Sequence, residues 1–366
     1  MAGPVRQPLD IPKLEAYLRN NLPNIITPLD VKQFGYGQSN PTYLLTTANK
    51  EQYVLRKKPP GTLISPTAHQ VDREYKIMAA LQQTSVPVPR TICLCQDTSV
   101  VGTSFYIMSF LKGRIFEDPA IPGVAPSERA AMWKSAVTTL SNLHSLDFAA
   151  VGLSSWDRPG AFYARQLKTL STVTDAQAKA VDVDTLEPVG PLPHQKDLVS
   201  FFGDKNRQPR DKRTLVHGDY KLDNLVFHPS EPYVIGILDW EMATVGHPLA
   251  DLANLIAPWT LATCTPAREA EVAHAGFIPG ATAGLPTLEQ CIKWYEEGMD
   301  RVDRRELEWA EAFNVYRNTV IMHGIAARYA RRQASSARAI KYVKQLKPFS
   351  DAAWELVNAQ KTKAKL

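Results

Sequence analysis

The sequence contains little cysteine and no long apolar run. Only 4 of the 366 residues are cysteines, and only Cys93 and Cys95 lie close together. A single Cys-x-Cys pair does not complete a zinc site, and cysteines among apolar neighbours are by default buried thiols. No apolar segment approaches the ~20 residues that a membrane span requires, and the first ten residues lack the apolar core of a secretory signal. The sequence therefore predicts a protein of a reducing compartment without a membrane span.

A strong excess of either charge is also missing. Lys and Arg number 42 against 37 Asp and Glu, which gives a formal net charge of +5. This excess suits an anionic ligand such as a nucleotide, but it is too small to predict nucleic-acid binding. Much of it lies between residues 328 and 347, where it is typical of the solvated face of a helix.

Residues from about 30 to 111 have the pattern of a small antiparallel sheet with one inserted helix. The helix is predicted at about residues 69–83, because Val71, Tyr75, Met78 and Leu81 recur on one helical face. Another helix is predicted to begin behind Asp10, which can cap it. Short apolar runs bounded by turn residues predict strands at residues 31–36, 42–47, 52–57, 91–95 and 104–111.

After Gly113 the pattern becomes mainly helical. Short strands are expected at residues 214–216, 225–227 and 234–238. Helices are predicted at residues 127–146 (with Ser127 as the cap), 161–170, around 194–202, and over most of the chain from 249 apart from a Gly/Pro loop at 277–286. The predicted fold class is α+β, because a strand-rich segment is followed by a mainly helical one. Two lobes are expected, because a chain of this length exceeds the roughly 100–200 residues of one domain. The expected division is a β-rich lobe of residues 1–111 and a larger helical lobe of residues 112–366.

Two short apolar strands enclose a polar loop that runs from Val216 through Asp219 to Asn224, and the next strand ends at Asp239. Phosphoryl transfer from ATP requires such groups: one carboxylate orients the accepting hydroxyl, and an amide and a second carboxylate hold Mg²⁺. Asp, Asn and Gly are also ordinary turn residues. The complete spacing, with Asn five positions after Asp219, favours a kinase site with ATP and Mg²⁺ as cofactors.

This segment, with Gly246-His247-Pro248-Leu249-Ala250-Asp251, resembles the aminoglycoside phosphotransferase and choline kinase family, which has a protein-kinase-like fold. The resemblance implies that Asp219 is the catalytic base and that His217 braces the loop. It implies that Asn224 and Asp239 are the Mg²⁺ ligands.

The resemblance also implies a role for the segment that follows the second metal ligand. Asp251 is expected to bond back to the catalytic loop. His247 stands where the family usually has aspartate, which changes a charge near the site but removes no expected catalytic group.

A glycine-containing segment, Gly35-Tyr36-Gly37-Gln38-Ser39-Asn40, resembles the family's phosphate-covering loop. Gly35 and Gly37 would let backbone N–H groups approach phosphate oxygens, and Ser39 would add a hydroxyl. Two glycines between strands also suit an ordinary hairpin. The position of the segment ahead of the other motifs favours a nucleotide-binding loop that includes Asn40.

In Val54-Leu55-Arg56-Lys57, strand alternation allows only one of the two basic side chains to face the nucleotide. We expect this to be Arg56, on the same face as Val54, in the place where kinases carry a phosphate-pairing lysine. Glu74 is its expected partner.

The segment Met108-Ser109-Phe110-Leu111 is expected to connect the two lobes. Backbone groups of Ser109 and Leu111 are predicted to bond adenine.

The acceptor is less well defined than the donor. Aromatic residues of the second lobe can line an acceptor pocket, as in a choline-type cage, or fill the helical core; they are Phe162, Tyr163, Trp240 with its neighbour Glu241, Trp259, Tyr295 and the helix at 316–329. The carboxylates between residues 294 and 311 alternate with arginines, which predicts a salt-bridged helix face instead of an aminoglycoside site.

The resemblance is strongest to the kinase-like domains fused to acyl-CoA dehydrogenases. It covers about residues 30–330 and is carried by residues 53–61, 71–75, 216–227 and 239–252. It implies a small-molecule acceptor with a hydroxyl, specifically a hydroxyacyl-CoA phosphorylated during fatty-acid breakdown. The late basic helix would then meet CoA phosphates.

The tail Ala364-Lys365-Leu366 differs by one small residue from the peroxisomal address Ser-Lys-Leu. A peroxisomal location is therefore an expectation, with a cytoplasmic one otherwise.

Two other functions stay open. One is an antibiotic or secondary-metabolite kinase with an aminoglycoside-like or choline-like acceptor. The other is a catalytically silent nucleotide-binding module, because Arg56 replaces the usual lysine. A protein kinase is disfavoured, because no Ala-Pro-Glu segment follows Asp239 at a suitable distance.

Overall fold

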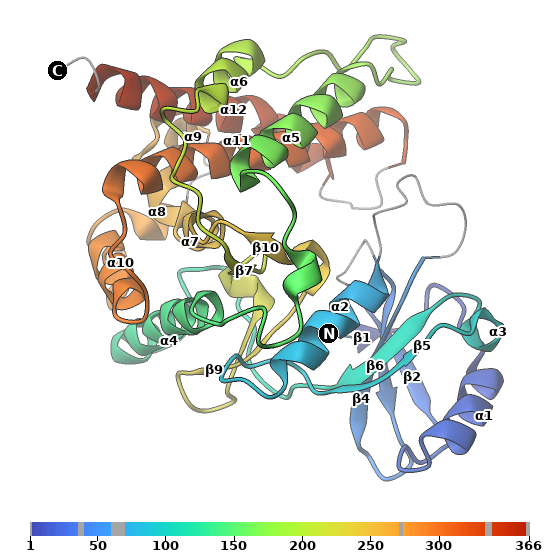
Figure 1. The fold of residues 1–366 in the computed structure, drawn as a ribbon. Coiled ribbons are helices and arrows are strands. Elements are labelled where there is room, and N and C mark those ends of the chain that lie inside the picture. Colours follow the sequence, from blue (N-terminus) through green and yellow to red (C-terminus); the bar gives the residue numbers. More distant parts are fainter. Residues whose placement is uncertain (1, 36–39, 60–69, 271–273, 334–338, 364–366) are drawn as a thin grey trace. The chain divides into compact units, whose positions relative to one another are not determined.

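The computed structural model describes residues 2–35, 40–59, 70–270, 274–333 and 339–363 (Figure 1). Gly37, Ser39 and the tail Ala364-Lys365-Leu366 lie outside the described residues. The chain divides into two compact units that are each discontinuous in sequence. The first unit consists of Met1–Ile115, Val151–Leu153 and Asn224–Ala243, and the second of Phe116–Ala150, Ser154–Asp223 and Thr244–Leu366.

The first unit is built on a six-stranded sheet whose strand order is β1-β2-β3-β4-β6-β5 (Figure 1). All neighbouring strands in it are antiparallel. The strands are β1 (Ala2–Gly3), β2 (Asp30–Phe34), β3 (Thr42–Thr46), β4 (Gln52–Lys57), β5 (Thr91–Cys95) and β6 (Phe105–Ser109). The five predicted strands are confirmed, whereas β1 is too short to leave a pattern in the sequence.

In the described part of this unit, three helices accompany the sheet: α1 (Ile11–Asn21), α2 (Val71–Leu81) and α3 (Thr98–Val101). Asp10 caps α1 as predicted, because its carboxylate accepts a hydrogen bond of 3.1 Å from the Lys13 N–H. Leu14 and Leu18 of α1 are fully buried and belong to the same core cluster as Leu55 of β4. This packing assigns one face of β4 to the hydrophobic core.

A short hairpin, β8 (Leu225–Phe227) with β9 (Val234–Ile237), also belongs to the first unit. The 3₁₀ turns η2 (Leu222–Asn224) and η3 (Trp240–Met242) border it. Gly236 lies in β9 at a point of close approach, because a Cβ atom there would overlap the side chain of Leu111. The hairpin therefore requires glycine at this position in order to pack on the chain around Leu111.

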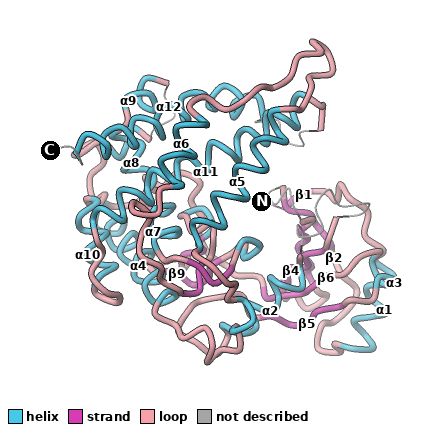
Figure 2. The backbone as a smooth tube through the Cα atoms, turned by 45° about the horizontal axis from the view of Figure 1, so that its top comes forward, coloured by secondary structure: helices cyan, strands magenta, loops and turns pink. Residues whose placement is uncertain are grey.

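The second unit is mainly helical, as the cyan tube of Figure 2 shows. Its strands β7 (Thr214–Val216) and β10 (Thr244–Gly246) form a two-stranded antiparallel sheet. Its helices and 3₁₀ turns are α4 (Pro126–His144), η1 (Ser154–Trp156), α5 (Phe162–Ala178), α6 (Gln195–Gly203), α7 (Leu249–Leu255), α8 (Ala257–Thr263), α9 (Thr265–Glu269), η4 (Ala275–Phe277), α10 (Leu288–Glu296), α11 (Arg304–Ala330) and α12 (Ala339–Lys363).

Two helix predictions need correction. Ser127 is not the cap of α4, because the helix already begins at Pro126, which suits a first helical turn. The helix predicted at 161–170 continues to Ala178 as α5. The hydroxyls of Thr172 and Thr174 donate to the carbonyls four residues earlier, at 3.0 and 2.8 Å, so these polar residues are accommodated inside the helix.

The predicted α+β class is confirmed. The helix expected around 194–202 is also confirmed, as α6. Across the ranges that the structure describes, no helix is long and apolar enough to cross a membrane.

Candidate active site

Arg56 is the centre of a partly buried cluster of basic and acidic side chains in the first unit. Its side chain is 9% exposed and its NH2 nitrogen lies 2.8 Å from Asp239 Oδ1 and 3.4 Å from Glu241 Oε2. Its Nε lies 3.2 Å from Glu74 Oε2, at an angle that makes an ion pair and not a hydrogen bond. Burial works against the charge of Arg56, but Glu74 and the other carboxylates outweigh burial and raise its pKa. The structure thus places Arg56 beside Glu74, as the sequence predicts, and also beside Asp239 and Glu241, which the sequence did not pair with Arg56.

Glu74 is held by two further side chains. Asn40 Nδ2 donates to Glu74 Oε1 at 2.8 Å, and the Tyr106 hydroxyl donates to Glu74 Oε2 at 3.0 Å. Burial raises the pKa of Glu74 to about 7, although Arg56 acts in the opposite direction. Asn40, predicted as part of the phosphate-covering loop, is fully buried and here supports the carboxylate that pairs with Arg56.

Lys57 points to the opposite face of β4, as strand alternation requires. It is buried, and its ammonium donates to the Val101 carbonyl at 3.0 Å. Burial lowers its pKa. Of the two adjacent basic residues, Arg56 is therefore the one that lies with Glu74 and Asp239.

Asn224 and Asp239 are positioned by the β8–β9 hairpin. The Leu238 N–H donates to the Asn224 carbonyl at 2.8 Å, so the two predicted metal ligands lie at the same end of the hairpin. Asp239 has a left-handed backbone, with φ 64° and ψ 57°. Aspartate is among the few non-glycine residues that adopt this conformation readily.

The donor set fits a divalent cation. Three carboxylates, those of Glu74, Asp239 and Glu241, surround the guanidinium of Arg56, which leaves an excess of negative charge. Amide and carboxylate oxygens are the protein ligands that Mg²⁺ prefers, and it commonly takes only one or two of them together with phosphate oxygens and water. Within the described ranges, no closed cluster of three or more His, Cys, Asp or Glu side chains forms a metal site. Asn224 and Asp239 would hold the ion in an open site.

The loop that carries Asp219 belongs to the second unit and is held through Asp251. The backbone N–H groups of His217 and Gly218 donate to the two oxygens of the Asp251 carboxylate at 2.6 and 2.8 Å. Gly218 has φ 84°, a conformation that favours glycine. The Asp219 N–H in turn donates to His217 Nδ1 at 3.2 Å. His217 is fully buried and therefore lies where it can brace the loop.

In the described part of the chain, three further side chains lie near the Asp219 loop, and the sequence patterns assign no role to them. Asn254 Nδ2 donates to Asp219 Oδ1 at 3.3 Å and to the next residue's carbonyl at 3.1 Å. Lys221 Nζ lies 3.5 Å from Asp219 Oδ2. From α11, Arg317 donates to the Gly218 carbonyl at 2.7 Å. Asn254 lies on α7 about one helical turn after the last carboxylate of the motif, and this spacing alone does not assign it to catalysis.

His247, at the position where the family usually has aspartate, accepts a backbone hydrogen bond at the start of α7. Its Nδ1 accepts the Leu249 N–H at 3.2 Å, and its Nε2 lies 3.0 Å from the Arg210 carbonyl. Nδ1 as acceptor and Nε2–H as donor describe one neutral tautomer. Burial lowers the His247 pKa to about 4. The replacement therefore removes a negative charge but keeps an acceptor for the backbone at the start of α7.

The aromatic residues considered for an acceptor pocket lie in the hydrophobic core. Tyr163 is 4% exposed and its ring centroid lies 4.7 Å from that of Trp309. Trp259 is 7% exposed and packs at 4.7 Å against Trp133. Trp240, Tyr295 and Phe162 are buried as well. The burial of these rings favours the core over an aromatic cage, and their large apolar surfaces stabilise the fold.

Ser109 and Leu111 follow the last strand of the six-stranded sheet. The Ser109 N–H donates to the Arg90 carbonyl at 2.8 Å, and the Ser109 hydroxyl accepts the Arg90 N–H at 2.9 Å. The Ser109 N–H is thus committed to strand pairing. The Leu111 side chain packs beside Gly236, and adenine binding by the backbone here stays a prediction.

Several carboxylates between residues 294 and 311 form ion pairs with basic residues from other segments, whereas the sequence predicted the neighbouring arginines as their partners. Arg210 bonds to Glu306 at 2.8 Å, and Lys363 bonds to Glu308 at 2.8 Å. Lys212 lies 3.6 Å from Asp300. These contacts favour a salt-bridged helix face.

Residues 30–286 match the model of the phosphotransferase enzyme family, abbreviated APH. Because the match covers more than half of the chain and includes both candidate motifs, the chain belongs to this family. The fold is accordingly the kinase-like α+β fold of these phosphotransferases.

The chain is also similar to curated proteins from animals. It is 36% identical over 365 residues to acyl-CoA dehydrogenase family member 10 of Mus musculus, a match that covers 98% of this chain and 32% of the relative. It is 35% identical over 355 residues to family member 11 of Homo sapiens, covering 95% of this chain and 43% of the relative. The chain therefore spans less than half the length of these relatives.

Among solved structures, a protein of Ralstonia eutropha assigned to the aminoglycoside phosphotransferases is 33% identical, with a TM-score of 0.79. The alignment covers 96% of this chain and 99% of that protein. The ethanolamine kinase of Plasmodium vivax is 14% identical, with a TM-score of 0.61 over 95% of this chain and 87% of its own. This second likeness concerns the fold alone.

Proposed function

We propose that this small-molecule phosphotransferase uses ATP with Mg²⁺ and transfers the γ-phosphoryl group to the hydroxyl of a hydroxyacyl-CoA. The observation that carries the proposal is the contact of Asp239 with Arg56 at the end of the hairpin that also holds Asn224. This arrangement combines a phosphate-pairing cation with the oxygen ligands of a metal, as phosphoryl transfer requires.

On the donor side, Asn224 and Asp239 hold Mg²⁺, which neutralises charge on the phosphate oxygens when it is bound. Arg56 pairs with phosphate oxygens through its planar guanidinium. Glu74 holds Arg56 in place through their ion pair, and Asn40 and Tyr106 hold Glu74.

On the acceptor side, Asp219 orients the substrate hydroxyl and receives its proton. The hydroxyl oxygen forms a bond to the γ-phosphorus while the bond from that phosphorus to the bridging oxygen of ADP breaks. Asn254 orients the Asp219 carboxylate, and Asp251 holds the loop through the backbone of His217 and Gly218.

The choice of an acyl thioester as the acceptor is supported by the charge and the exposure of residues on α11, the helix whose Arg317 contacts the catalytic loop. Arg317 donates to Gly218 in that loop, and Ile321, one helical turn further on, is 44% exposed. From residue 312 to 330 this helix contains no Asp or Glu. A positive charge followed by an exposed aliphatic side chain suits an anionic molecule with an acyl chain, whereas a polycationic aminoglycoside would require carboxylates. The names of the animal relatives point to the same class of acyl-CoA.

The test is ADP formation by the purified chain with a panel of acceptors, combined with mass spectrometry of the product. We expect hydroxyacyl-CoA to stimulate ADP formation and to become a phosphoester, whereas the same acyl-CoA without the hydroxyl does neither. Asp219→Asn should abolish the stimulated rate. Stimulation by choline or an aminoglycoside, with none by any hydroxyacyl-CoA, would instead favour the antibiotic or choline-like acceptor.

A pair of matched variants tests the acceptor surface on α11. Ile321→Asp should raise the KM for hydroxyacyl-CoA several-fold without changing the KM for ATP. Ile26→Asp is the control, because Ile26 belongs to the first unit and is 46% exposed, close to the 44% of Ile321. Equal effects of the two variants would contradict a role of Ile321 in acyl binding.

A further inference from the structure

His144 connects the catalytic loop of the second unit to Tyr295. Its Nε2 lies 3.3 Å from Asp251 Oδ2, and its Nδ1 lies 2.7 Å from the Tyr295 hydroxyl. His144 and Tyr295 are each 2% exposed, and Asp251 is fully buried. The three residues come from α4, α10 and α7, so no local sequence pattern brings them together.

Asp251 already accepts two backbone hydrogen bonds from the catalytic loop. Its Oδ2 accepts the His217 N–H, and its Oδ1 accepts the Gly218 N–H. Burial works against the Asp251 carboxylate, but the hydrogen bond from His144 and other contacts outweigh burial and lower the Asp251 pKa. An ionised carboxylate can only accept hydrogen bonds, so the nitrogen that His144 turns toward it has to carry a hydrogen.

For a neutral imidazole, this requirement determines the tautomer of His144. With the hydrogen on Nε2, a neutral imidazole has an acceptor at Nδ1. The Tyr295 hydroxyl faces Nδ1 and can donate to it. Without that hydroxyl, the hydrogen is able to move to Nδ1, and the lone pair of Nε2 would then face the oxygen of Asp251. The carboxylate would be pushed away from the two N–H groups that it holds.

We propose that Tyr295 and His144 are positioning residues, in which the Tyr295 hydroxyl holds His144 in the Nε2–H tautomer and thereby holds Asp251 against the catalytic loop. This inference rests on the proposed phosphotransferase function, because the positioned group is the loop that carries Asp219. Neither residue touches the reacting groups.

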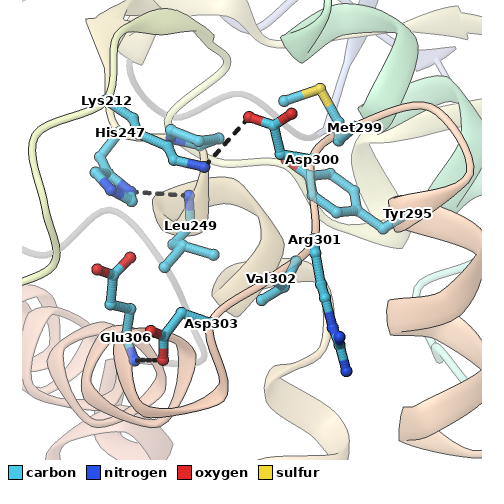
Figure 3. A pocket seen from close by; sticks show the side chains of 11 residues that line it. Lys212, His247, Leu249, Tyr295, Met299, Asp300, Arg301, Val302, Asp303 and Glu306 are labelled. Atoms are coloured by element: carbon cyan, nitrogen blue, oxygen red, sulfur yellow. Dashed lines mark hydrogen bonds and ion pairs between the residues drawn. The ribbon is translucent and has the colours of Figure 1, made fainter.

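The contacts that run from Asp251 through His144 to Tyr295 form a relay. This relay ends at a pocket in the second unit, where Tyr295 forms part of the wall (Figure 3). Lys212 and Asp300 form an ion pair in the same wall, and the His247 imidazole accepts the Leu249 N–H there. Leu249 begins α7, the helix that carries Asp251. Two independent contacts, one through His144 and one through His247, therefore act on the helix that holds the loop.

The direct test is ¹⁵N NMR of the histidine rings in the full chain, with His144 assigned by its loss in His144→Gln. We expect the Nε2–H tautomer for His144 in the unmodified protein and a shift toward the Nδ1–H tautomer in Tyr295→Phe. This measurement does not depend on catalysis, so it separates failure of the relay from failure of the proposed function. An Nδ1–H tautomer or a doubly protonated ring in the unmodified protein would overturn the inference.

The kinetic test uses the same variant. Tyr295→Phe should lower kcat about 10-fold, within the range found when an outer partner of a functional group is removed, and leave the KM for ATP unchanged. Tyr43→Phe is the control, because Tyr43 is a fully buried tyrosine of the first unit whose hydroxyl donates to a carbonyl, that of Gln7, at 3.0 Å. A Tyr295→Phe variant that melts earlier but keeps full kcat would contradict a positioning role.

A double-mutant cycle gives a second check. Gln at position 144 offers an amide N–H donor near the place of Nε2 and has no tautomer to control. Tyr295→Phe should therefore lower kcat in the unmodified protein but have little further effect in the His144→Gln background. Equal effects in both backgrounds would show that Tyr295 acts independently of His144.

Discussion

Asp239 and Arg56 are separated by 183 residues in sequence and joined by a hydrogen bond of 2.8 Å. This contact unites the central strand β4 with the hairpin β8–β9 inside one unit of the fold. It also places a candidate metal ligand against a candidate phosphate-binding cation, so each residue limits where the other can lie before any nucleotide binds.

Replacing Arg56 should affect both stability and nucleotide binding. Arg56→Met leaves Glu74, Asp239 and Glu241 without their shared cation, and breaking such a buried pair costs about 3 kcal/mol of unfolding free energy. We also expect a higher KM for ATP. Chemical denaturation and initial-rate kinetics check the two effects.

Lys57→Met is the matched control for the kinetic effect, because Lys57 lies on the other face of the same strand and bonds to Val101. Its KM for ATP should stay unchanged. If Lys57→Met impairs ATP use more than Arg56→Met does, the assignment of the phosphate-pairing residue is wrong.

Glu311 should make stability depend on pH. Burial raises the Glu311 pKa from 4.5 to about 7, with the Thr260 hydroxyl donating to it at 2.6 Å. A carboxyl whose folded pKa is raised binds its proton more tightly in the folded state, so its contribution is present below pH 4.5 and is lost as pH rises toward 7. The unfolding free energy should fall relative to that of Glu311→Gln by up to about 3 kcal/mol across this window.

Denaturation of both proteins at several pH values measures this difference. Glu74, whose pKa is also raised to about 7, contributes equally to the pH dependence of stability in both proteins. Its contribution therefore cancels in the difference between their unfolding free energies. Parallel stability curves for the two proteins between pH 4.5 and 7 would contradict the prediction.

Gly236→Ala should destabilise the hairpin that carries Asn224 and Asp239. The new methyl group would overlap Leu111, and overpacking of this kind costs about 1–3 kcal/mol. Thermal unfolding measures the loss. A double-mutant cycle with Leu111→Ala should recover part of it, whereas Gly3→Ala is a neutral control because no atom lies within 4 Å of the added Cβ. Additive effects of the Gly236 and Leu111 changes would exclude the overlap as the cause.

Substitutions of His247 should separate the contribution of its hydrogen bond from that of its packing. His247→Ala leaves the Leu249 N–H without its acceptor and should cost about 1–2 kcal/mol. Asn at this position offers a side-chain oxygen to the same N–H, so His247→Asn should lose less. Denaturation curves compare the two variants, and equal losses would indicate that packing of the imidazole matters more than its hydrogen bond.

Features with a local pattern could be predicted from the sequence. The period of two in β4 identifies Arg56, not Lys57, as the residue that lies with Glu74, and the capping carboxylate of Asp10 marks the start of α1. Helical spacing was less informative for α5, because hydroxyl residues that usually interrupt helices bond back to its carbonyls. The strand β10 contains only Thr244, Val245 and Gly246, which is too few residues for a pattern.

Features that depend on long-range packing could not be predicted. The sequence around Tyr163 and Trp259 is compatible either with a pocket or with a core. Only their packing, Tyr163 against Trp309 and Trp259 against Trp133, places them in the core. Asn254 and Arg317 likewise reach the catalytic loop from helices, and their residue types are common on any helix surface.

The left-handed backbone of Asp239 determines how this position can be studied. Most side chains adopt that conformation only with strain, whereas asparagine tolerates it nearly as well as aspartate. Alanine or a β-branched residue would therefore change the conformation of the turn together with the charge. Asparagine is the substitution that removes the charge alone, and results from other replacements at this position would mix a backbone effect with an electrostatic one.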